Sequence, residues 1–356
     1  MTAASGDGKG VRGRVKCVIW DLDDTLWDGV LLEPGQIRLR ANVVRRIREL
    51  DERGILHSIA SKNDRDAALA KLEELGIAEY FLYPQINWNA KSSSIRQIAG
   101  ALNIGIDALA FVDDQPFERA EVAHNLPDVL TVDAAEVDSA LERPEFRPRF
   151  VTGESRHRRA MYQDAAARDR AEQDFVGTSQ EFLATLDMEL TIREAGPEDL
   201  QRAEELTVRT NQLNSTGVTY SFAELDQLRR SPSHLLLCAA LKDRYGDYGT
   251  IGLCLVEKSS DRWRLLLLIM SCRVMSRGVG TVLLNYVMTL AGEAGARLRA
   301  DFVDTGRNRM MQVTYMFAGF REAARDGDRV ELECAPSSVQ EPPAYLRLRV
   351  PARSGR

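Results

Sequence analysis

Apolar runs alternate with amphipathic helical patterns through the first 145 residues of this 356-residue chain. Short runs of Val, Ile, Leu and Phe predict strands, and apolar residues three or four positions apart predict helices between them. The predicted strands lie near 15–20, 55–60, 80–83, 109–112 and 129–132, and the predicted helices near 41–53, 64–75, 92–102 and 117–124. This alternation is typical of an α/β fold with a doubly wound parallel sheet.

A second α/β pattern occupies the C-terminal half. Strands are predicted near 189–193, 234–241, 249–257, 262–271 and 297–303, and helices from Pro197, near 279–294 and near 308–318. Between the halves, Ser155 to Phe175 is charged and poor in large apolar residues. We interpret this stretch as a helical connector capped by a serine at its start.

Five segments follow from these patterns. They are a disordered leader at 1–14, a first domain at 15–145, the connector at 146–187, a second domain at 188–335 and a tail at 336–356. The leader is polar and rich in Gly, and it lacks the apolar core of a signal peptide.

Composition narrows the classes of function. The net charge of −6 argues against general nucleic-acid binding, which needs a basic surface. No apolar run is long enough to span a bilayer, so we expect no membrane partner. Five cysteines without a Cys-x-x-Cys pair fit neither a disulfide framework nor a zinc site. The expected compartment is the cytoplasm.

The candidate chemistry of the first half begins with two acids. Asp21 and Asp23 follow the apolar run Val18–Trp20, and the hydroxyl of Thr25 comes two residues later. Acids at positions i and i+2 share one face of a strand, and two adjacent carboxylates favour a hard cation such as Mg²⁺. A bare Asp-x-Asp can equally be an ordinary turn after a strand.

Three further elements follow in the order that a phosphoryl-transfer site needs. Ser61 ends a second apolar strand, Lys91 opens a predicted helix, and Asp113 and Asp114 end a third apolar strand. A hydroxyl and a cation can hold phosphate oxygens, and two more carboxylates can complete a Mg²⁺ site. Each element alone has a structural explanation, such as a helix cap or a surface lysine.

Over residues 15–145 the chain resembles the HAD superfamily of phosphatases on these four elements. The resemblance implies that Asp21 is the nucleophile that forms an aspartyl-phosphate and that Asp23 is the general acid and base. It also implies groups that hold the phosphoryl group, namely Thr25, Ser61 and Lys91. The implied Mg²⁺ ligands are Asp21, the Asp23 carbonyl, Asp113 and Asp114. Only a hairpin candidate at 27–40 stands where a large cap domain could be inserted.

The second half carries a glycine loop between a predicted strand and a predicted helix. Gly278 and Gly280 form this loop, and Asn308, Tyr315 and the pair Gly319-Phe320 follow. On these features residues 188–335 resemble the GNAT acyltransferases, which bind a pyrophosphate on such a loop. Met275 stands where GNAT proteins usually have Gln or Arg. The loop is therefore expected to receive either coenzyme A or the phosphopantetheine arm of a carrier protein.

Two polar stretches complete the candidate residues. Cys272 follows an apolar strand, and a thiolate there, favoured by Arg273 and a helix N-terminus, could carry an acyl group. A buried structural cysteine is the alternative. The carboxamides of Asn211, Gln212 and Asn214 could orient an acyl substrate or a pantetheine amide, or could simply end a helix.

Four segments occur together in one chain, at Trp20–Leu31, Phe111–Arg119, Arg209–Asn214 and Met270–Met275. In this combination the chain resembles the FkbH-like family, the bifunctional glyceryltransferase/phosphatases of polyketide biosynthesis. The resemblance implies that 1,3-bisphosphoglycerate is the donor and that a phosphopantetheinylated acyl carrier protein receives its glyceryl group as a thioester. It also implies removal of the 3-phosphate with Mg²⁺ as the cofactor. The product would supply methoxymalonyl-type extender units or tetronates.

Two alternatives to this function remain. One is a HAD phosphatase fused to a coenzyme A-dependent N-acyltransferase, which would not need Cys272. The other is a scaffold that only docks carrier proteins, against which the intact acids argue. Arg156–Arg159 and Arg229-Arg230 are the arginine clusters that the sequence offers for carrier docking.

Overall fold

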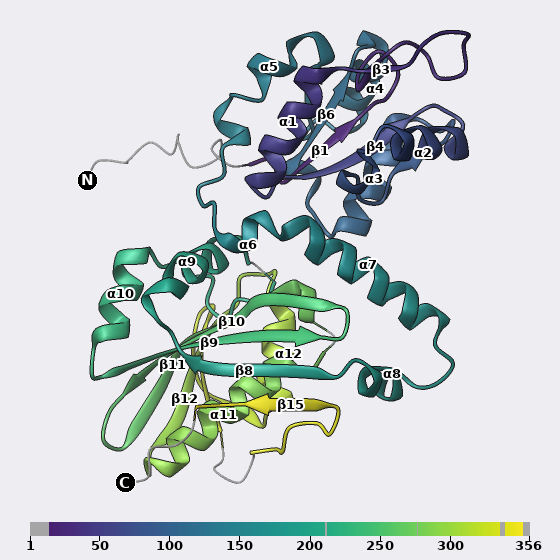
Figure 1. Cartoon of the computed structure of the whole chain (residues 1–356). Coiled ribbons are helices and arrows are strands. Elements are labelled where there is room, and N and C mark those ends of the chain that lie inside the picture. Colours follow the sequence, from purple (N-terminus) through teal and green to yellow (C-terminus); the bar gives the residue numbers. More distant parts are fainter. Residues whose placement is uncertain (1–13, 211, 276, 335–338, 352–356) are drawn as a thin grey trace, which may run out of the picture. The chain divides into compact units, whose positions relative to one another are not determined.

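The computed structural model describes residues 14–210, 212–275, 277–334 and 339–351. The expected leader at 1–14 therefore lies almost entirely outside the described residues. The chain divides into two compact units, Met1–Ala166 and Ala167–Arg356, which we call unit 1 and unit 2. Both have the predicted α/β fold class (Figure 1).

Unit 1 is built on a five-stranded sheet in the order β5-β4-β1-β6-β7, with every pairing parallel. Its strands are β1 Cys17–Trp20, β4 Leu56–Ser61, β5 Gln85–Ile86, β6 Leu109–Asp113 and β7 Leu130–Asp133. The doubly wound parallel sheet is thus confirmed. The strand expected near 80–83 is wrong, because that segment makes only a single bridge from Phe81 to His57 before Tyr83 turns with a φ of 49°.

Helices cover both faces of this sheet. They are α1 Ala41–Glu52, α2 Arg65–Glu74, α3 Lys91–Leu102, α4 Pro116–Asn125 and α5 Val137–Ala140. Side chains alternate along β1, so Val18 and Trp20 pack with α1, α2 and α5, whereas Cys17 and Ile19 pack with α3 and α4. The apolar runs of the sequence are uninterrupted because these strands are buried on both faces.

The segment between β1 and α1 is short and holds only a small hairpin. Its strands, β2 Trp27–Asp28 and β3 Arg38–Leu39, pair antiparallel as the hairpin candidate predicts. All of residues 21–40 are described, and they contain no inserted cap domain. The carboxyl ends of the strands in unit 1 are therefore not covered by an insertion at this point.

The connector contains α6 Gly153–Arg156, α7 Arg158–Asp174 and α8 Ser179–Thr185. The expected serine cap is wrong, because Thr152 caps α6 by accepting a hydrogen bond from the Ser155 amide. Ser155 instead closes the capping box by accepting from the Thr152 amide, so both exposed amides are satisfied. The boundary between the two units falls within α7, between Ala166 and Ala167.

Unit 2 has an eight-stranded mixed sheet in the order β13-β14-β12-β11-β10-β9-β8-β15. Its strands are β8 Met188–Glu194, β9 His234–Asp243, β10 Gly246–Lys258, β11 Arg262–Met270, β12 Arg297–Val303, β13 Phe320–Asp326, β14 Arg329–Cys334 and β15 Leu346–Arg349. Five of these strands match the sequence prediction. The strands β13, β14 and β15 do not appear in it, and β15 lies within the expected tail.

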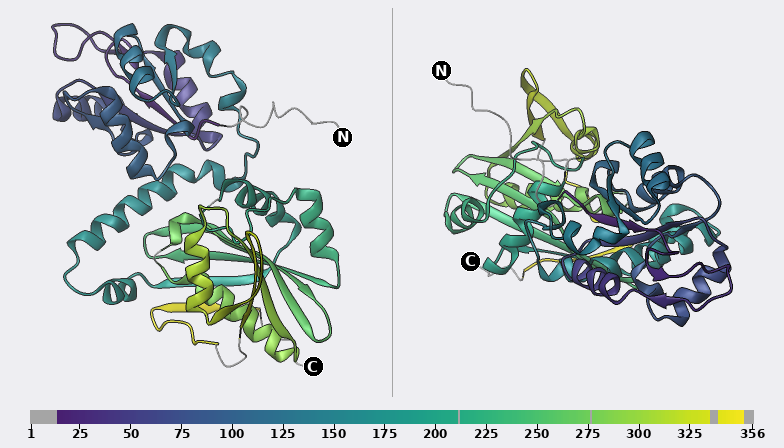
Figure 2. Two further views of the ribbon diagram at one scale, coloured as in Figure 1. Left: turned by 180° about the vertical axis from the view of Figure 1, so that it is seen from behind. Right: turned by 90° about the horizontal axis from the view of Figure 1, so that it is seen from above.

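Helices pack on the unit 2 sheet in two apolar clusters. Leu206 of α9 Leu200–Arg209 and Leu225 of α10 Phe222–Arg230 share one apolar cluster with the sheet. The other cluster contains α11 Val279–Glu293 and α12 Arg309–Phe317, which the view from behind shows in front of the strands (Figure 2). Among the described residues, no helix combines the length and the apolar character needed to cross a bilayer.

Candidate active site

The acids of unit 1 converge where its strands end. Asp21 directly follows β1, Asp113 is the last residue of β6, and Asp114 comes next. Since β1 and β6 pair in parallel, with Trp20 opposite Val112, their carboxyl ends lie side by side. One ligand oxygen from each of the three carboxylates lies within 4.8 Å of the others. The structure thus brings these three predicted residues together, and we call them the carboxylate cluster.

Lys91 is the cation of this cluster. Its ammonium donates a hydrogen bond to Asp21, lies 3.4 Å from Asp113 Oδ2, and donates to the carbonyl of Ala60 at 2.7 Å. The side chain is buried, so these contacts lie in a poorly solvated environment. One positive charge faces three carboxylates, which leaves the cluster with an excess of negative charge.

The carboxylate cluster fits a divalent metal ion. Asp113 Oδ2 is buried and receives no hydrogen bond from the described residues. Burial and the neighbouring charge of Asp21 raise the pKa of Asp113 to about 7, and the same two causes raise the pKa of Asp114. A hard divalent cation bound by carboxylate oxygens would relieve this repulsion, and Mg²⁺ prefers such ligands.

Asp23 lies outside the carboxylate cluster and is held by its own donors. Trp27 Nε1 at 2.8 Å and the Leu31 amide at 3.1 Å donate to Oδ1, and Asn63 Nδ2 donates to Oδ2 at 2.9 Å. Burial raises the pKa of the Asp23 carboxyl, although these hydrogen bonds oppose the shift. The carboxyl is fixed in position and only half-buried, as a proton-transfer group needs to be.

Two residues with a direct part in this arrangement were missed by sequence reasoning. Trp27 and Asn63 both donate to Asp23, one from the short hairpin and one from the segment after β4. Asn63 was visible as a polar residue two positions after Ser61, and it is buried. A buried carboxamide next to a candidate phosphate-binding strand is a signal that could have identified it.

The two predicted hydroxyl groups differ in their contacts. Thr25 Oγ1 donates to Asp114 Oδ1 at 3.3 Å and accepts from the Asp114 amide at 3.0 Å. In this structure Thr25 therefore orients a member of the carboxylate cluster. Ser61 is buried at the end of β4, next to Ala60, whose carbonyl accepts from Lys91. Ser61 thus lies at the carboxyl ends of the strands, as the acids do.

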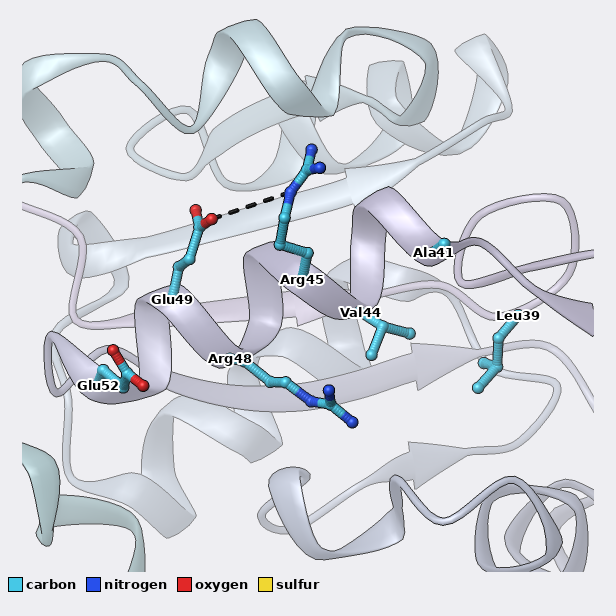
Figure 3. A pocket seen from close by; sticks show the side chains of 7 residues that line it. All are labelled: Leu39, Ala41, Val44, Arg45, Arg48, Glu49 and Glu52. Atoms are coloured by element: carbon cyan, nitrogen blue, oxygen red, sulfur yellow. Dashed lines mark ion pairs between the residues drawn. The ribbon is translucent and has the colours of Figure 1, made fainter.

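A separate hollow of about 460 Å³ runs along α1 (Figure 3). The residues that line it are Leu39, Ala41, Val44, Arg45, Arg48, Glu49 and Glu52. It contains no member of the carboxylate cluster. Its charged residues are two arginines and two glutamates, and Arg45 lies 3.9 Å from Glu49, as on an ordinary solvated helix face.

The glycine loop of unit 2 borders a small cavity of about 70 Å³ with a mixed polar and apolar lining. Gly278 has a φ of 73°, and a Cβ there would lie 3.0 Å from the hydroxyl oxygen of Tyr345. The backbone angle favours glycine, and a Cβ would also press on the Tyr345 hydroxyl. The cavity is lined by Leu213, Met270, Val274, Met275, Gly278, Gly280, Thr281, Met310, Met311 and Thr314. Both predicted loop glycines thus border a narrow space that fits an unbranched chain better than a bulky group.

The candidate nucleophile Cys272 begins the 3₁₀ turn η6 Cys272–Val274, and its side chain lies outside the described structure. The neighbouring Arg273 donates to the carbonyl of Tyr248 at 3.0 Å. Burial raises the pKa of the Cys17 and Cys254 thiols, and raises that of Cys334 to about 11. These three thiols therefore fit structural roles.

The other predicted residues of unit 2 do not gather at this cavity. Asn211 lies outside the described residues, and Gln212 is exposed. The carboxamide oxygen of Asn214 accepts from the amides of Thr216 and Gly217 at 3.1 and 2.9 Å, so it is used within a turn. Tyr315 is completely buried, with its ring edge-on to Phe302 and Phe320.

The segment Leu213–Ser215 lies between the ends of two parallel strands of unit 2. Leu213 accepts from the Met270 amide of β11, and Ser215 accepts from the Val303 amide of β12, both at 2.9 Å. Asn308, just before α12, stabilises the segment by donating to the Asn214 carbonyl at 2.9 Å. The predicted polar stretch at 211–214 thus leads into an inserted strand-like segment.

Comparison with protein-family models finds no match, and comparison with curated proteins finds none. Solved structures similar to parts of the chain include the N-terminal part of BF1531 from Bacteroides fragilis, a phosphatase domain complexed with Mg, at 31% identity and a TM-score of 0.32. That match covers 36% of this chain, and this chain spans only 39% of that one.

Two further solved structures match part of the chain at lower identity. Ard1 from Thermoplasma volcanium is 19% identical, with 40% of this chain and 95% of that chain covered and a TM-score of 0.32. The paia N-acetyltransferase from Thermoplasma acidophilum, in complex with coenzyme A, is 18% identical, with 41% and 98% covered and a TM-score of 0.31. Because these TM-scores are low, the chemistry of each site is judged from its own residues.

Proposed function

We propose that this chain is a bifunctional enzyme in which unit 1 hydrolyses a phosphate monoester and unit 2 transfers a glyceryl group to an acyl carrier protein. The observation that carries the proposal is the carboxylate cluster of Asp21, Asp113 and Asp114 with Lys91 at its edge. The sequence resemblance to the FkbH-like glyceryltransferase/phosphatases supplies the donor, 1,3-bisphosphoglycerate, and the acceptor, a phosphopantetheinylated carrier.

The phosphatase step uses Asp21 as the nucleophile. Asp21 attacks phosphorus, the bond from phosphorus to the ester oxygen breaks, and Asp23 gives its proton to the departing oxygen. Water then attacks the aspartyl-phosphate, and Asp23 accepts a proton from that water. Inorganic phosphate leaves and Asp21 is restored. The raised pKa of Asp23 supports this role, because the group must carry a proton before the first step.

Asp21, Asp113 and Asp114 would hold Mg²⁺, together with the Asp23 carbonyl that the HAD resemblance implies. When bound, Mg²⁺ supplies positive charge that favours the approach of a phosphate to these acids. Lys91 and Ser61 would hold phosphate oxygens, and Thr25 would keep Asp114 in place. Hydrolysis of phosphate monoesters is extremely slow without a catalyst, so this set of groups suits the task.

The transfer step uses an acyl phosphate, which is already activated. The Cys272 thiolate would attack its carbonyl carbon, and the bond to the phosphate oxygen would break to release phosphate. The pantetheine thiol of the carrier would then lose its proton to solvent and attack the Cys272 thioester, so that the acyl group moves to the carrier and the Cys272 thiolate is restored. Unit 1 removes the 3-phosphate before or after this transfer, which leaves a glyceryl group. The narrow cavity beside Gly278 and Gly280 supports this proposal, because a pantetheine arm is a thin unbranched chain.

Intact-protein mass spectrometry tests the proposal. The full chain is mixed with Mg²⁺, an enzymatic source of 1,3-bisphosphoglycerate and a phosphopantetheinylated carrier protein. Wild type, Cys272→Ala and Asp21→Asn are compared, with Cys334→Ala as the matched control for loss of a thiol. We expect wild type and Cys334→Ala to load glyceryl, Asp21→Asn to load a phosphoglyceryl group, and Cys272→Ala to load neither.

Other outcomes are also decisive. Glyceryl loading that survives Cys272→Ala would keep the function and exclude the Cys272 relay. Absence of any carrier adduct, together with acylation of an amine from acetyl-coenzyme A, would instead favour a phosphatase fused to an N-acyltransferase. Absence of phosphate release from any phosphate monoester with wild type would refute the phosphatase function.

A further inference from the structure

A row of charged side chains crosses three neighbouring strands at one edge of the unit 2 sheet. Arg347 of β15 lies opposite Glu189 of β8, and Glu189 lies opposite Lys242 of β9. Lys242 Nζ and Arg349 Nε lie 2.9 and 2.7 Å from the Glu189 carboxylate, and Arg347 lies 3.6 Å from it. We call Lys242, Arg347 and Arg349 the β15 basic patch.

The β15 basic patch presents net positive charge to solvent. Its three side chains are 59%, 66% and 60% exposed, whereas the side chain of Glu189 is only 6% exposed. Three cations meet one carboxylate, so the local charge is positive on a chain whose formal net charge is −6. The buried carboxylate contacts the charged ends of all three side chains, which nevertheless stay more than half exposed.

The arginine clusters that the sequence suggested for docking contain arginines that are paired with nearby carboxylates. Arg229 and Arg230 both contact Asp226, which lies on their own helix α10. In the other cluster, Arg159 contacts Asp51 and Glu79. An acidic partner would have to compete with these internal carboxylates, which weakens attraction at both clusters.

The β15 basic patch lies at the same end of the sheet as the glycine loop. The end of β11, at Met270, is level with Gly252 of β10, Ala239 of β9 and Ile192 of β8. Lys242 and Glu189 lie three residues further along β9 and β8 in the direction in which β11 ends. Strand β15 runs beside β8 at the sheet edge (Figure 1).

A direct contact links β15 to the loop. The Tyr345 hydroxyl, one residue before β15, lies 3.0 Å from the position that a Cβ of Gly278 would take. Arg347 is only two residues beyond Tyr345, so its backbone lies about 7 Å along the chain from the backbone of Tyr345. By strand alternation the patch side chains point to the α9–α10 face of the sheet, whereas the cavity lies on the α11–α12 face. A partner seated on the patch would therefore reach the cavity beside Gly278 around the edge strand β15.

We infer that the β15 basic patch is the docking surface for the acidic face of a phosphopantetheinylated acyl carrier protein. This inference deepens the proposed function and rests on it, because it takes the carrier as the acceptor. Carrier proteins are generally acidic, and the overall acidity of this chain would repel them elsewhere. Exposed complementary charges mainly raise the association rate, and salt weakens their effect.

Binding is the test, because it does not depend on catalysis. The affinity of a fluorescently labelled phosphopantetheinylated carrier protein is measured by anisotropy for the full chain. The charge-reversed variant is R347E/R349E, and R347Q/R349Q is a milder variant that avoids new repulsion with Glu189. R229E/R230E is the matched control, since it reverses two arginines on α10 of the same unit.

At about 0.05 M salt we expect R347E/R349E to bind about tenfold or more weakly, R347Q/R349Q to lie between it and wild type, and the α10 control to match wild type. At about 0.5 M salt the differences should largely disappear. Glyceryl transfer to free pantetheine and hydrolysis of a small phosphate monoester should be unchanged in all variants.

The opposite results are equally informative. Equal carrier binding by wild type and R347E/R349E, equal weakening by the α10 control, or no binding by wild type would each overturn the inference. Weakened binding by R347E/R349E without any glyceryl transfer by wild type would instead uphold the docking surface and refute the proposed transfer reaction.

Discussion

The two units bury charge in opposite ways. In unit 1, Asp21, Asp113 and Asp114 converge, Lys91 contacts the first two, and Asp113 Oδ2 receives no hydrogen bond from the described residues. In unit 2, Arg168 and Asp243 are equally buried but form two hydrogen bonds of 2.6 and 3.0 Å with each other. Buried charge as such therefore does not mark a site, whereas an excess of one sign does.

The pairing in unit 2 is more complete than a simple ion pair. Tyr248 donates its hydroxyl to Asp243 at 2.9 Å, and the Arg168 guanidinium lies 4.3 Å from the centre of the Tyr248 ring. Glu205 shows the same behaviour, since Arg202 and Arg209 lie 2.8 and 3.2 Å from it. These charges need no ligand, whereas the carboxylate cluster of unit 1 does.

The largest effect should come from Asp21→Asn. The amide cannot act as the nucleophile, so we expect the rate of phosphate release to fall on the order of a thousandfold or more. Colorimetric assay of phosphate release from a small monoester measures it. Replacing an acid of the paired kind, as in Asp243→Asn, should leave this rate within about twofold if unit 1 remains folded. An equal loss of phosphate release in Asp21→Asn and Asp243→Asn would contradict the assignment of the active site to unit 1.

The free energy of unfolding should fall more for a variant of the paired acid Asp243 than for a variant of the carboxylate cluster. Asp243→Asn leaves Arg168 buried without its charge partner, and breaking such a pair costs about 3–5 kcal/mol of unfolding free energy. Asp113→Asn in Mg²⁺-free buffer removes repulsion from Asp21 and should cost less than about 1 kcal/mol. Hydrogen exchange of β9 and β6 peptides measures the two units separately. Similar destabilisation by both variants would show that the cluster is structural.

Magnesium should stabilise only unit 1. At a concentration of 100 times its dissociation constant, Mg²⁺ should add about 2.7 kcal/mol to the unfolding free energy of unit 1. Slower hydrogen exchange in β1 and β6, without change in β9 and β10, would show this. The effect should be lost in Asp113→Asn. Equal protection of both units by Mg²⁺ would mean that the ion does not bind at the carboxylate cluster.

The smallest effect concerns His57, a completely buried histidine of unit 1. Trp20 Nε1 lies 3.1 Å from Nδ1 and the Ile47 carbonyl lies 3.0 Å from Nε2, which fits a neutral ring with its proton on Nε2. Burial lowers the pKa of His57 to about 3, whereas its ordinary value is 6.5. The unfolded chain therefore takes up the proton first as the pH falls.

Stability from the neutral His57 is present above pH 6.5 and is lost as the pH falls towards 3, at about 1.4 kcal/mol per pH unit. Urea unfolding of unit 1 between pH 7 and pH 5 measures this slope. His57→Gln keeps one acceptor and one donor but does not titrate. Its unfolding free energy should therefore change less steeply with pH, by the amount that corresponds to about one proton. Identical slopes in the two proteins would contradict this account.

Much of unit 1 could be predicted because the sequence signals of its strands lie within short segments of the chain. Apolar runs bounded by glycines and polar turns mark β1, β4 and β6, and parallel strands place Asp21 and Asp113 at one sheet edge. The strand expected near 80–83 failed because the positive φ of Tyr83 interrupts an apolar segment that is otherwise buried. No periodic pattern reveals such a backbone turn.

Unit 2 was harder to predict because its decisive pairings join distant residues. Arg168 and Asp243 are 75 positions apart, and neither lies in a recognisable motif. The polar residue Asn214 resembles a ligand-binding group in the sequence, yet its side chain is used by two backbone amides of its own turn. The role of Cys272 stays a prediction, and so do the domain boundaries expected at residues 145 and 188.

The amino-acid sequence by itself determined five strands of unit 2, most strands of unit 1 and which acids follow the strands, because these depend on hydrophobic periodicity and on neighbours in the chain. Only the tertiary structure decided which charges are neutralised. It pairs Thr25 with Asp114 and brings Arg347 beside Glu189 in a parallel strand pair. The physical reason is that electrostatic balance depends on distances between side chains, and the packing of the sheets sets those distances.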